Sequence, residues 1–392
     1  MTVVRSYTVT GNNQDTTLNQ IMIARPGASG TVTATCKVAA TSTDSDKVRA
    51  LQIAASKLVA QTSGAAITGA VDGAIGDAFG NGGTPVTFGP NGITFNFAAE
   101  PRSEMAQRTD DAFPALGYAR GGIVTKAPPA PVAAREWSLW ADVHGTGWDR
   151  NNNNSDGALN GEQLNVTAGI GRKLTPDFLI GLLGGYEQFK YTSAALAGTF
   201  RGDGGTIGSY AAWRFAPALR WDATLAWSSI AYDATAGSAN GAFHGSRWLA
   251  STGLTGIYRW AALIFEPSAK VFALWERQAA WTDSLGTLQA ARDFSAGRVA
   301  VGGKVIAPWQ ASPTMTIAPY LGLYADWRFS TDNALPAGQP IVGIGDGWSG
   351  RVTGGVTVTQ LRGGTLALGG EYGGIGANYR VWTANARLYW AW

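Results

Sequence analysis

The chain has 392 residues, of which 15% are charged and 53 are glycine, against usual shares of about 25% for charged residues and about 7% for glycine. This composition argues against a disordered chain, a coiled coil and an ordinary soluble helical enzyme. The mean hydropathy is −0.03, and no apolar run approaches the ~18 residues of a spanning helix, which excludes a helical membrane protein. An alternating β-barrel averages to such values, because one face is apolar and the other polar.

Neither the charge nor the cysteine content of the chain indicates a binding partner. The net charge of +3 is small and spread along the chain, so no nucleic-acid partner is expected. The single cysteine, Cys36, has no Cys or His neighbour at metal-binding spacing and is expected to be incidental. No P-loop or nucleophile-elbow motif occurs. The sequence therefore predicts neither a cofactor nor a metal.

Aromatic residues divide the chain. All 16 Trp lie at or beyond Trp137, directly after a Pro/Ala segment that is typical of a semi-rigid spacer. Upstream, weak alternation predicts a few strands, and a stretch of three- and four-residue apolar spacing predicts a helix. We therefore expect a truncated, passenger-like β segment at 1–45, a helix at 46–82, a hairpin with a short helix and a Pro-rich linker at 83–135, and a β domain at 136–392.

The predicted helix, from Asp46 to Asp77, has unusually small side chains in its second half. Each glycine costs a free-standing helix about 1 kcal/mol relative to alanine, so their number needs a physical reason. Close approach to a surrounding wall supplies one. The glycines concerned are Gly64, Gly69, Gly73 and Gly76.

From residue 136 onward the dominant period is two, which predicts strands with one apolar and one polar face. Twelve strands are expected, at about 136–149, 161–174, 177–192, 199–215, 218–234, 243–259, 262–283, 292–309, 313–331, 346–361, 364–376 and 379–392. An even number of antiparallel strands is typical of bacterial outer-membrane barrels.

Connections and aromatic residues show the asymmetry of such a barrel. Tight turns near 174–177, 216–217, 260–261, 310–312 and 362–363 alternate with mostly longer polar loops, such as 150–160, 235–243 and 331–345. Aromatic side chains are expected to form two interfacial belts. One belt lies beside the tight turns (Trp213, Phe215, Trp221, Trp260, Trp309, Trp390 and Trp392), and the other lies near the long loops (Trp148, Tyr232, Trp281, Trp327 and Trp348).

Charged residues of the strands are expected to face the lumen, because an unpaired charge facing lipid costs about 2–4 kcal/mol near the midplane. The candidates are Asp222, Arg214, Lys304, Glu371, Arg351 and Arg387. A soluble β protein with the Trp-rich face as its core is the alternative, since alternation also occurs in sandwiches.

Three segments resemble a known family: Glu136-Trp-Ser-Leu-Trp140, Phe265-Glu-Pro-Ser-Ala-Lys-Val271 and Arg387-Leu-Tyr-Trp-Ala-Trp392. Residues 136–392 resemble the translocator barrel of a monomeric autotransporter of type V secretion. The resemblance implies an all-β, twelve-stranded antiparallel transmembrane barrel in the bacterial outer membrane. Such a barrel anchors its own N-terminal passenger and supports its export to the cell surface.

The resemblance also implies partners and roles. The ending, with Leu388, Trp390 and Trp392, is similar to the signal read by the barrel-assembly machinery, where a terminal Phe is commoner than Trp. Outer-membrane lipid and periplasmic chaperones are further implied partners, and a monomer is expected. A helix before the barrel fills the pore in this family. The helix at 46–82 suits that role as a plug, and the segment 104–116 and the Pro-rich linker are the alternatives.

Two other functions stay open at this stage. One is a general outer-membrane diffusion channel. The other is a hydrolase active at the barrel rim, similar to the omptins, which would use His144 and Asp142 on the polar face of their strand. Because no nucleophile accompanies this pair, the sequence predicts that the protein is not an enzyme.

Overall fold

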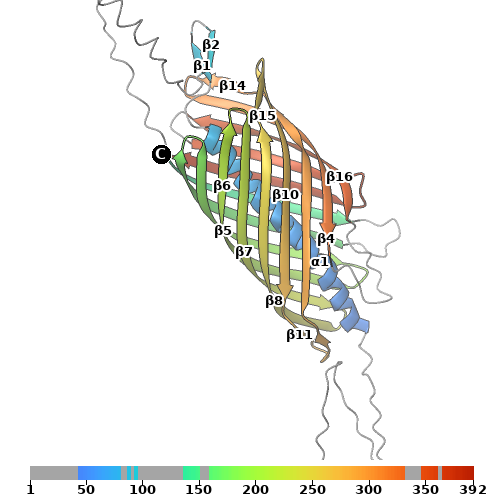
Figure 1. The fold of residues 1–392 in the computed structure, drawn as a ribbon. Helices are drawn as coiled ribbons and strands as arrows, with labels where there is room; N and C mark the ends of the chain where they lie inside the picture. Colours follow the sequence, from blue (N-terminus) through green and yellow to red (C-terminus); the bar gives the residue numbers. More distant parts are fainter. Residues whose placement is uncertain are drawn as a thin grey trace, which may run out of the picture.

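The structure is a computed structural model and describes residues 43–80, 86–89, 92–95, 136–150, 159–331, 346–360 and 364–392. Within these residues a long helix passes through a closed antiparallel barrel of twelve long strands (Figure 1). Cys36, the predicted helix near 104–116 and the Pro-rich linker lie outside the described residues. Among the described residues no helix is long and apolar enough to cross a membrane.

Helix α1 (Thr43–Gly80) begins three residues before the predicted start at Asp46 and continues three residues past Asp77, within the predicted segment 46–82. Its first turn includes Thr43, Asp44 and Ser45, and the side chains of Asp44 and Ser45 hydrogen-bond to barrel residues. At ~1.5 Å per residue the helix measures about 57 Å, which exceeds the ~40–45 Å thickness of a bilayer with its headgroups. A hairpin follows, made of β1 (Val86–Gly89) and β2 (Gly92–Phe95).

Each barrel strand pairs with its sequence neighbours, and the last strand returns to the first. The long strands are β3 (Trp137–Arg150), β4 (Leu159–Thr175), β5 (Phe178–Ser193), β6 (Gly198–Ala216), β7 (Leu219–Ala236), β8 (Ala239–Gly256), β10 (Leu263–Gln278), β13 (Arg292–Ile306), β15 (Met315–Ser330), β16 (Gly347–Gln360), β17 (Gly364–Ile375) and β18 (Arg380–Ala391). β18 pairs with β3, and two backbone hydrogen bonds of 3.0 and 3.2 Å between Trp137 and Trp392 end this seam.

Side chains alternate between the outside and the lumen along every strand. The outward positions are apolar and exposed, for example Leu182, Ile207, Leu321 and Leu388, each at least 60% exposed. The apolar face therefore does not form a core. The alternative of a soluble β protein is wrong, because its Trp-rich face would have to be buried.

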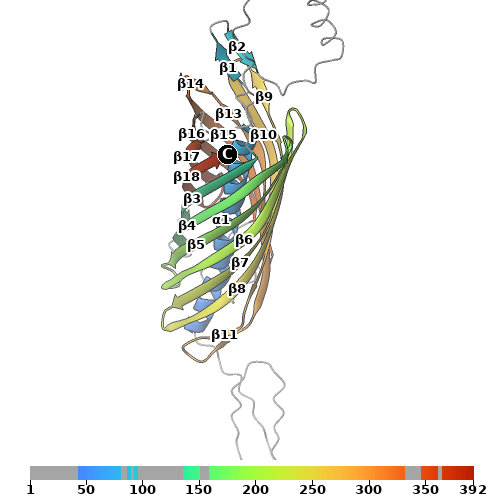
Figure 2. The same cartoon turned by 90° about the vertical axis from the view of Figure 1, so that its left-hand side faces the viewer.

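The two ends of the barrel differ in their connections. We call the end with the connections β4–β5, β6–β7, β8–β10 and β13–β15 the turn end, and the opposite end, where α1 begins, the loop end. Short strands β9 (Tyr258–Trp260) and β14 (Trp309–Ser312) extend the turn end. Figure 2 shows α1 inside the barrel from a second side.

Two connections at the loop end differ from the sequence prediction. The expected loop at 235–243 is a two-residue turn, Gly237-Ser238, because Gly237 adopts a φ of +56° that suits a tight reversal. The strand expected at 262–283 ends at Gln278, and a small hairpin of β11 (Trp281–Thr282) and β12 (Leu288–Gln289) follows. The carboxylate of Asp283 builds this hairpin by accepting the backbone N–H groups of Leu285 and Thr287.

The aromatic belt at the turn end points outward, whereas the predicted belt at the loop end is largely wrong. Trp327 and Trp348 are exposed there, but Trp148, Tyr232 and Trp281 are at most 6% exposed and face the lumen. These three residues occupy the alternate strand positions whose side chains point into the lumen, and this decides their orientation although they lie near the loops. Their side chains contact other aromatic rings and do not face lipid headgroups.

Candidate functional site: the helix-filled lumen

The lumen is occupied by α1, which runs from the loop end to the turn end (Figures 1 and 2). Its first turn contacts the β7–β8 turn, and its last turn contacts β6 near the β6–β7 turn. The helix packs most closely against the wall formed by β4, β6 and β7. It is therefore eccentric, and this position leaves polar space on the opposite side.

Hydrogen bonds tie the first turn of α1 to the loop end. Asp44 accepts the backbone N–H of Ser238 at 2.9 Å and its hydroxyl at 2.7 Å. Ser45 bonds to the hydroxyl of Thr287 at 3.0 Å, and Arg49 donates to the carbonyl of Ala290 at 2.8 Å. Hydrogen bonds from Lys47 and Ser238 hold the pKa of Asp44 well below its usual range.

Aromatic side chains from β3, β5, β6, β7, β8 and β11, and Tyr379 just before β18, pack together with α1 in the half of the lumen nearest the loop end. The ring centroids of neighbouring members lie 5.0 to 6.4 Å apart. Leu51 and Leu58 of α1 pack in the same buried cluster. We call this cluster the aromatic collar: Trp148, Phe189, Tyr191, Phe200, Tyr232, Phe243, Trp281 and Tyr379.

A buried network of charges lies just beneath the collar. Arg247 bonds to Glu276 at 2.8 Å and to Glu187 at 3.2 Å. Tyr232 donates to Glu276 at 2.6 Å, and Ser63 of α1 donates to Glu187. All the charged members are 2% exposed, so the network is held away from bulk water. Buried ion pairs of this kind are screened much less by salt than exposed ones.

Ion pairs hold the second half of α1. Asp72 bonds to Arg220 at 2.8 Å and also pairs with Lys270. Asp77 accepts from Arg387 at 2.9 Å. These contacts join the helix to β7, β10 and β18, which lie on different sides of the lumen. They fix the rotation of α1 as well as its depth.

Wall residues opposite the helix pair with each other. Arg351 bonds to Asp326 at 2.8 Å and to Glu371 at 2.7 Å, and Lys304 bonds to Glu266 at 2.9 Å. Between this wall and α1 lies a cavity of about 220 Å³, which is roomy and polar enough to hold water. The lumen is thus filled by apolar packing near the loop end and contains a polar cavity near the turn end.

The glycines of α1 differ in what surrounds them. A Cβ at Gly64 would lie 2.7 Å from the ring of Phe272, and one at Gly73 would overlap the guanidinium of Arg387. The nearest atoms to such a Cβ would be 3.7 Å away at Gly69 and 3.9 Å away at Gly76. Of these four glycines, only Gly64 and Gly73 therefore lie in close approach to side chains of the wall.

The six charged residues predicted for the lumen occupy different places in it. Asp222, Lys304, Arg351 and Glu371 line the large cavity, and so does Arg387, which reaches the helix. Arg214 lies at the turn end, pairs with Asp177 and stacks on Phe79 of α1 at 5.4 Å. The C-terminal residues Leu388, Trp390 and Trp392 are exposed on the outer face of β18 or at its end.

His144 and Asp142 form a buried pair in mid-lumen, against α1, instead of a site at the rim. A Cβ at Gly69 of the helix would lie 3.7 Å from Nε2 of His144. The helix therefore covers the pair that the hydrolase hypothesis requires.

Sequence reasoning missed the network of Glu187, Arg247 and Glu276 and the helix acids Asp72 and Asp77. Glu187, Arg247 and Glu276 lie at strand positions whose side chains point into the lumen. A search for opposite charges at the inward-facing positions of the strands would therefore have found them. The helix acids carried no comparable signal, because their partners lie on strands far away in the sequence.

A barrel with an apolar exterior, a charged lumen and a helix through that lumen defines an outer-membrane transport protein. The family model for the autotransporter β-domain matches residues 139–373, and the chain belongs to this family. It is the translocator domain of an autotransporter: it lies in the bacterial outer membrane, anchors the N-terminal passenger and supports passenger export to the cell surface.

Solved structures support the same fold. The β domain of the Bordetella autotransporter BrkA is similar with a TM-score of 0.56 and 17% identity, covering 66% of this chain and 100% of that one. The translocator domain of NalP from Neisseria meningitidis is similar with a TM-score of 0.54 and 9% identity, covering 73% of this chain and 95% of that one. None of the curated proteins is detectably similar in sequence.

Proposed function

We propose that α1 is the plug that closes the pore once the passenger has reached the surface. The observation that carries this proposal is that α1 is bound along its whole length, by hydrogen bonds at the loop end, by the aromatic collar and by ion pairs at the turn end. A segment that only passed through the lumen would not need specific partners at both ends.

Conductance in planar bilayers tests this role. Three chains are compared: the full chain, a chain that begins at Thr43 and keeps α1, and a chain that begins at Ala127 and lacks it. The first two are expected to be nearly closed and the third to form a stable open pore. Equal conductance in all three would contradict a plug and favour a general diffusion channel. An open chain from Thr43 would show that residues before α1 close the pore.

The domain is also proposed to make and break no covalent bond. This is supported by the burial of His144 and Asp142 beneath α1, where a substrate at the rim does not reach them. If refolded chain hydrolyses peptide, ester or lipid substrates and His144→Ala abolishes that activity, this part of the proposal fails.

Assembly partners form the last part of the proposal. The exposed side chains of Leu388, Trp390 and Trp392 would be read by the barrel-assembly machinery, after periplasmic chaperones deliver an unfolded monomer. β18 carries them beside β3, where the barrel closes. Replacing Trp390 and Trp392 by Ser is expected to reduce the assembled fraction severalfold in cells while refolding in detergent stays possible. Unchanged assembly would contradict this role.

A further inference from the structure

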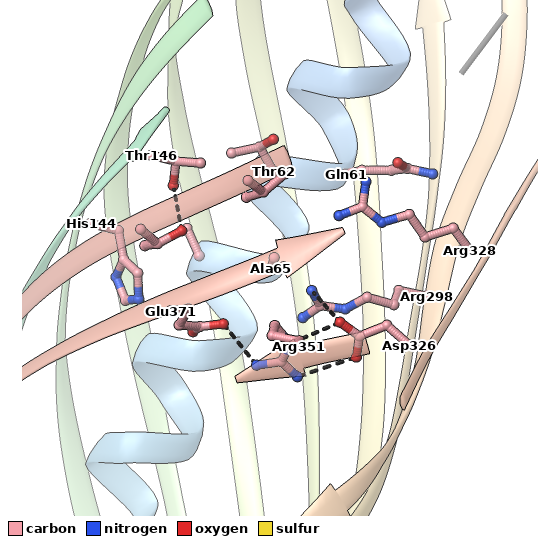
Figure 3. Close-up of a pocket in the computed structure, with 14 residues that line it drawn as sticks. Gln61, Thr62, Ala65, His144, Thr146, Arg298, Asp326, Arg328, Arg351 and Glu371 are labelled. Carbon is pink, nitrogen blue, oxygen red and sulfur yellow. Dashed lines mark hydrogen bonds and ion pairs between the residues drawn. The ribbon is translucent and has the colours of Figure 1, made fainter. Parts of the chain in front are cut away.

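Three arginines converge on a small cavity between α1 and the wall (Figure 3). Arg298 comes from β13, Arg328 from β15 and Arg351 from β16, and Gln61 and Thr62 line the helix side. The cavity measures about 40 Å³, which is room for about three or four water-sized spheres of about 10–15 Å³ each. It lies deep in the lumen, where a charge is poorly solvated.

The two carboxylates at this cavity form hydrogen bonds with only one of the three arginines. Asp326 accepts from Arg351 at 2.8 and 3.3 Å, and Glu371 accepts from Arg351 at 2.7 Å. Arg298 forms an ion pair with Asp326 at 3.7 Å, a distance too long for a hydrogen bond. Three guanidinium groups therefore face two carboxylates, and one positive charge is unbalanced.

Arg328 carries that unbalanced charge. It is 9% exposed, and its guanidinium stacks on the ring of Tyr379 at 4.4 Å. Among the described residues it has no carboxylate within 4.0 Å, and its buried Nη1 has no hydrogen-bond partner. Nε of Arg298 is buried without a partner in the same way. A buried cation without a counter-charge costs several kcal/mol, so this arrangement requires compensation.

We propose that the cavity binds a single small inorganic anion, with chloride as the ligand. The unpartnered N–H groups of Arg328 and Arg298 would hold it, since both arginines line the cavity. The small volume favours a monatomic halide over a tetrahedral oxyanion. The cavity adjoins the larger one, since His144, Arg298, Arg351 and Glu371 line both.

A bound anion at this place would join the wall to the plug. It neutralises Arg328, which supports Tyr379 of the collar, and it lies against the helix, whose Gln61 and Thr62 line the cavity. The closed state would then depend on the anion present, independently of the ion pairs at the turn end.

Line broadening in ³⁵Cl NMR of the refolded full chain tests binding directly. Arg328→Met removes the charge while keeping a long apolar stem, and Arg277→Met is the matched control, since Arg277 is 76% exposed on the outside of the loop end. We expect protein-dependent broadening that bromide displaces, that falls at least fivefold in R328M and that is unchanged in R277M. Equal broadening in R328M and the unsubstituted chain would overturn the proposal.

Stability in urea provides a second readout with a defined sign. Chloride and gluconate are compared at equal ionic strength, because gluconate is too large for the cavity. The unsubstituted chain is expected to unfold at higher urea in chloride, whereas R328M is expected to unfold at the same urea in both salts. In gluconate R328M should be at least as stable as the unsubstituted chain, since it has lost an unpaired buried charge. Stabilisation of both chains by chloride, or of neither, would overturn the proposal.

Discussion

The two halves of the lumen hold the same helix by different physical means. Near the loop end the aromatic collar packs on leucines of α1, and the buried cluster excludes water. Near the turn end, Asp72 and Asp77 pair with charged wall residues beside a cavity of about 220 Å³. The first half forms a seal, and the second sets the depth and rotation of the helix.

This difference separates two properties that a plug needs. Apolar packing is non-directional, so the collar can close around an apolar helix surface without fixing its register. Ion pairs and charge-assisted hydrogen bonds are directional and respond to salt, so the turn-end half fixes the register but holds less firmly in concentrated electrolyte. The two halves should therefore respond differently to substitution, salt and pH.

The largest expected effect comes from opening the collar. Phe200 is fully buried between Phe189, Tyr232 and Phe243, and Phe200→Ala is expected to lower the free energy of unfolding by about 3–5 kcal/mol. Urea unfolding in detergent measures this loss, and bilayer recordings should show a leak. Phe215→Ala, at a lipid-facing position, is the control and should not leak. A sealed F200A pore would show that the collar is not the seal.

Much of this comparison could be predicted from the sequence, and part of it could not. Strict alternation placed the strands, and small side chains together with 3.6-residue spacing placed the helix that lies in the lumen. Three members of the collar, Trp148, Tyr232 and Trp281, were predicted to lie in an outer belt, because their nearness to a loop was weighted above the alternation of faces along the strand. At Trp148 and Trp281 the alternation of side chains along the strand decides whether the ring faces the lumen or the lipid, however close the residue lies to the end of the barrel.

Long-range pairing was beyond sequence reasoning. Arg387 and Asp77 are 310 positions apart, and nothing in either local pattern identifies the partner. The same holds for the turn Gly237-Ser238, where a polar, small-residue stretch was predicted to be a loop. Its two-residue form depends on Gly237, whose left-handed φ is compatible with several loop lengths.

Breaking an ion pair at the turn end should have a smaller and salt-dependent effect. Arg387→Gln removes the charge that pairs with Asp77, and a charge-assisted hydrogen bond of this kind contributes about 1.5–3 kcal/mol. Single-channel recordings are expected to show roughly ten- to hundredfold more open time. Arg214→Gln, whose partner Asp177 is more than half exposed, should change little.

Salt sharpens this second prediction. Raising the salt concentration from ~0.1 M to ~1 M shortens the screening length from about 10 Å to about 3 Å. The unsubstituted chain should then open more often and approach R387Q, while the stability loss of F200A should stay the same. If salt leaves the opening of the unsubstituted chain unchanged, ion pairs do not hold the second half of α1.

A pair of glycine substitutions tests the geometry of the same half. A Cβ at Gly76 would lie 3.9 Å from its nearest neighbour, in ordinary contact, so Gly76→Ala should stabilise the seated helix by about 0.5–1 kcal/mol. At Gly73 the added methyl group would displace the guanidinium of Arg387 from Asp77. Gly73→Ala should therefore increase open time although it raises helix propensity. Effects of the same sign in both variants would contradict the close approach of Arg387 to the helix.

The smallest expected effect is that of low pH on the β11–β12 hairpin at the loop end. Burial opposes ionisation of Asp283, but hydrogen bonds from Ser45, Thr287, Gln289 and Leu285 outweigh it and hold the pKa of its carboxyl below the usual range. Because the folded-state pKa is the lower one, the stabilisation is present above the unfolded value of about 3.9 and is lost as the pH falls through the folded value. Hydrogen exchange at the amide of Thr287, corrected for intrinsic rates, should therefore accelerate as the pH is lowered from 6 to 3.

Two variants serve as controls for this prediction. In Asp283→Asn the amide of Thr287 should exchange faster at pH 6 and lose this pH dependence, whereas in Asp293→Asn, on the exposed surface, it should behave as in the unsubstituted chain. Equal protection at both pH values in the unsubstituted chain would show that the collar, and not the carboxylate, holds this end of the lumen.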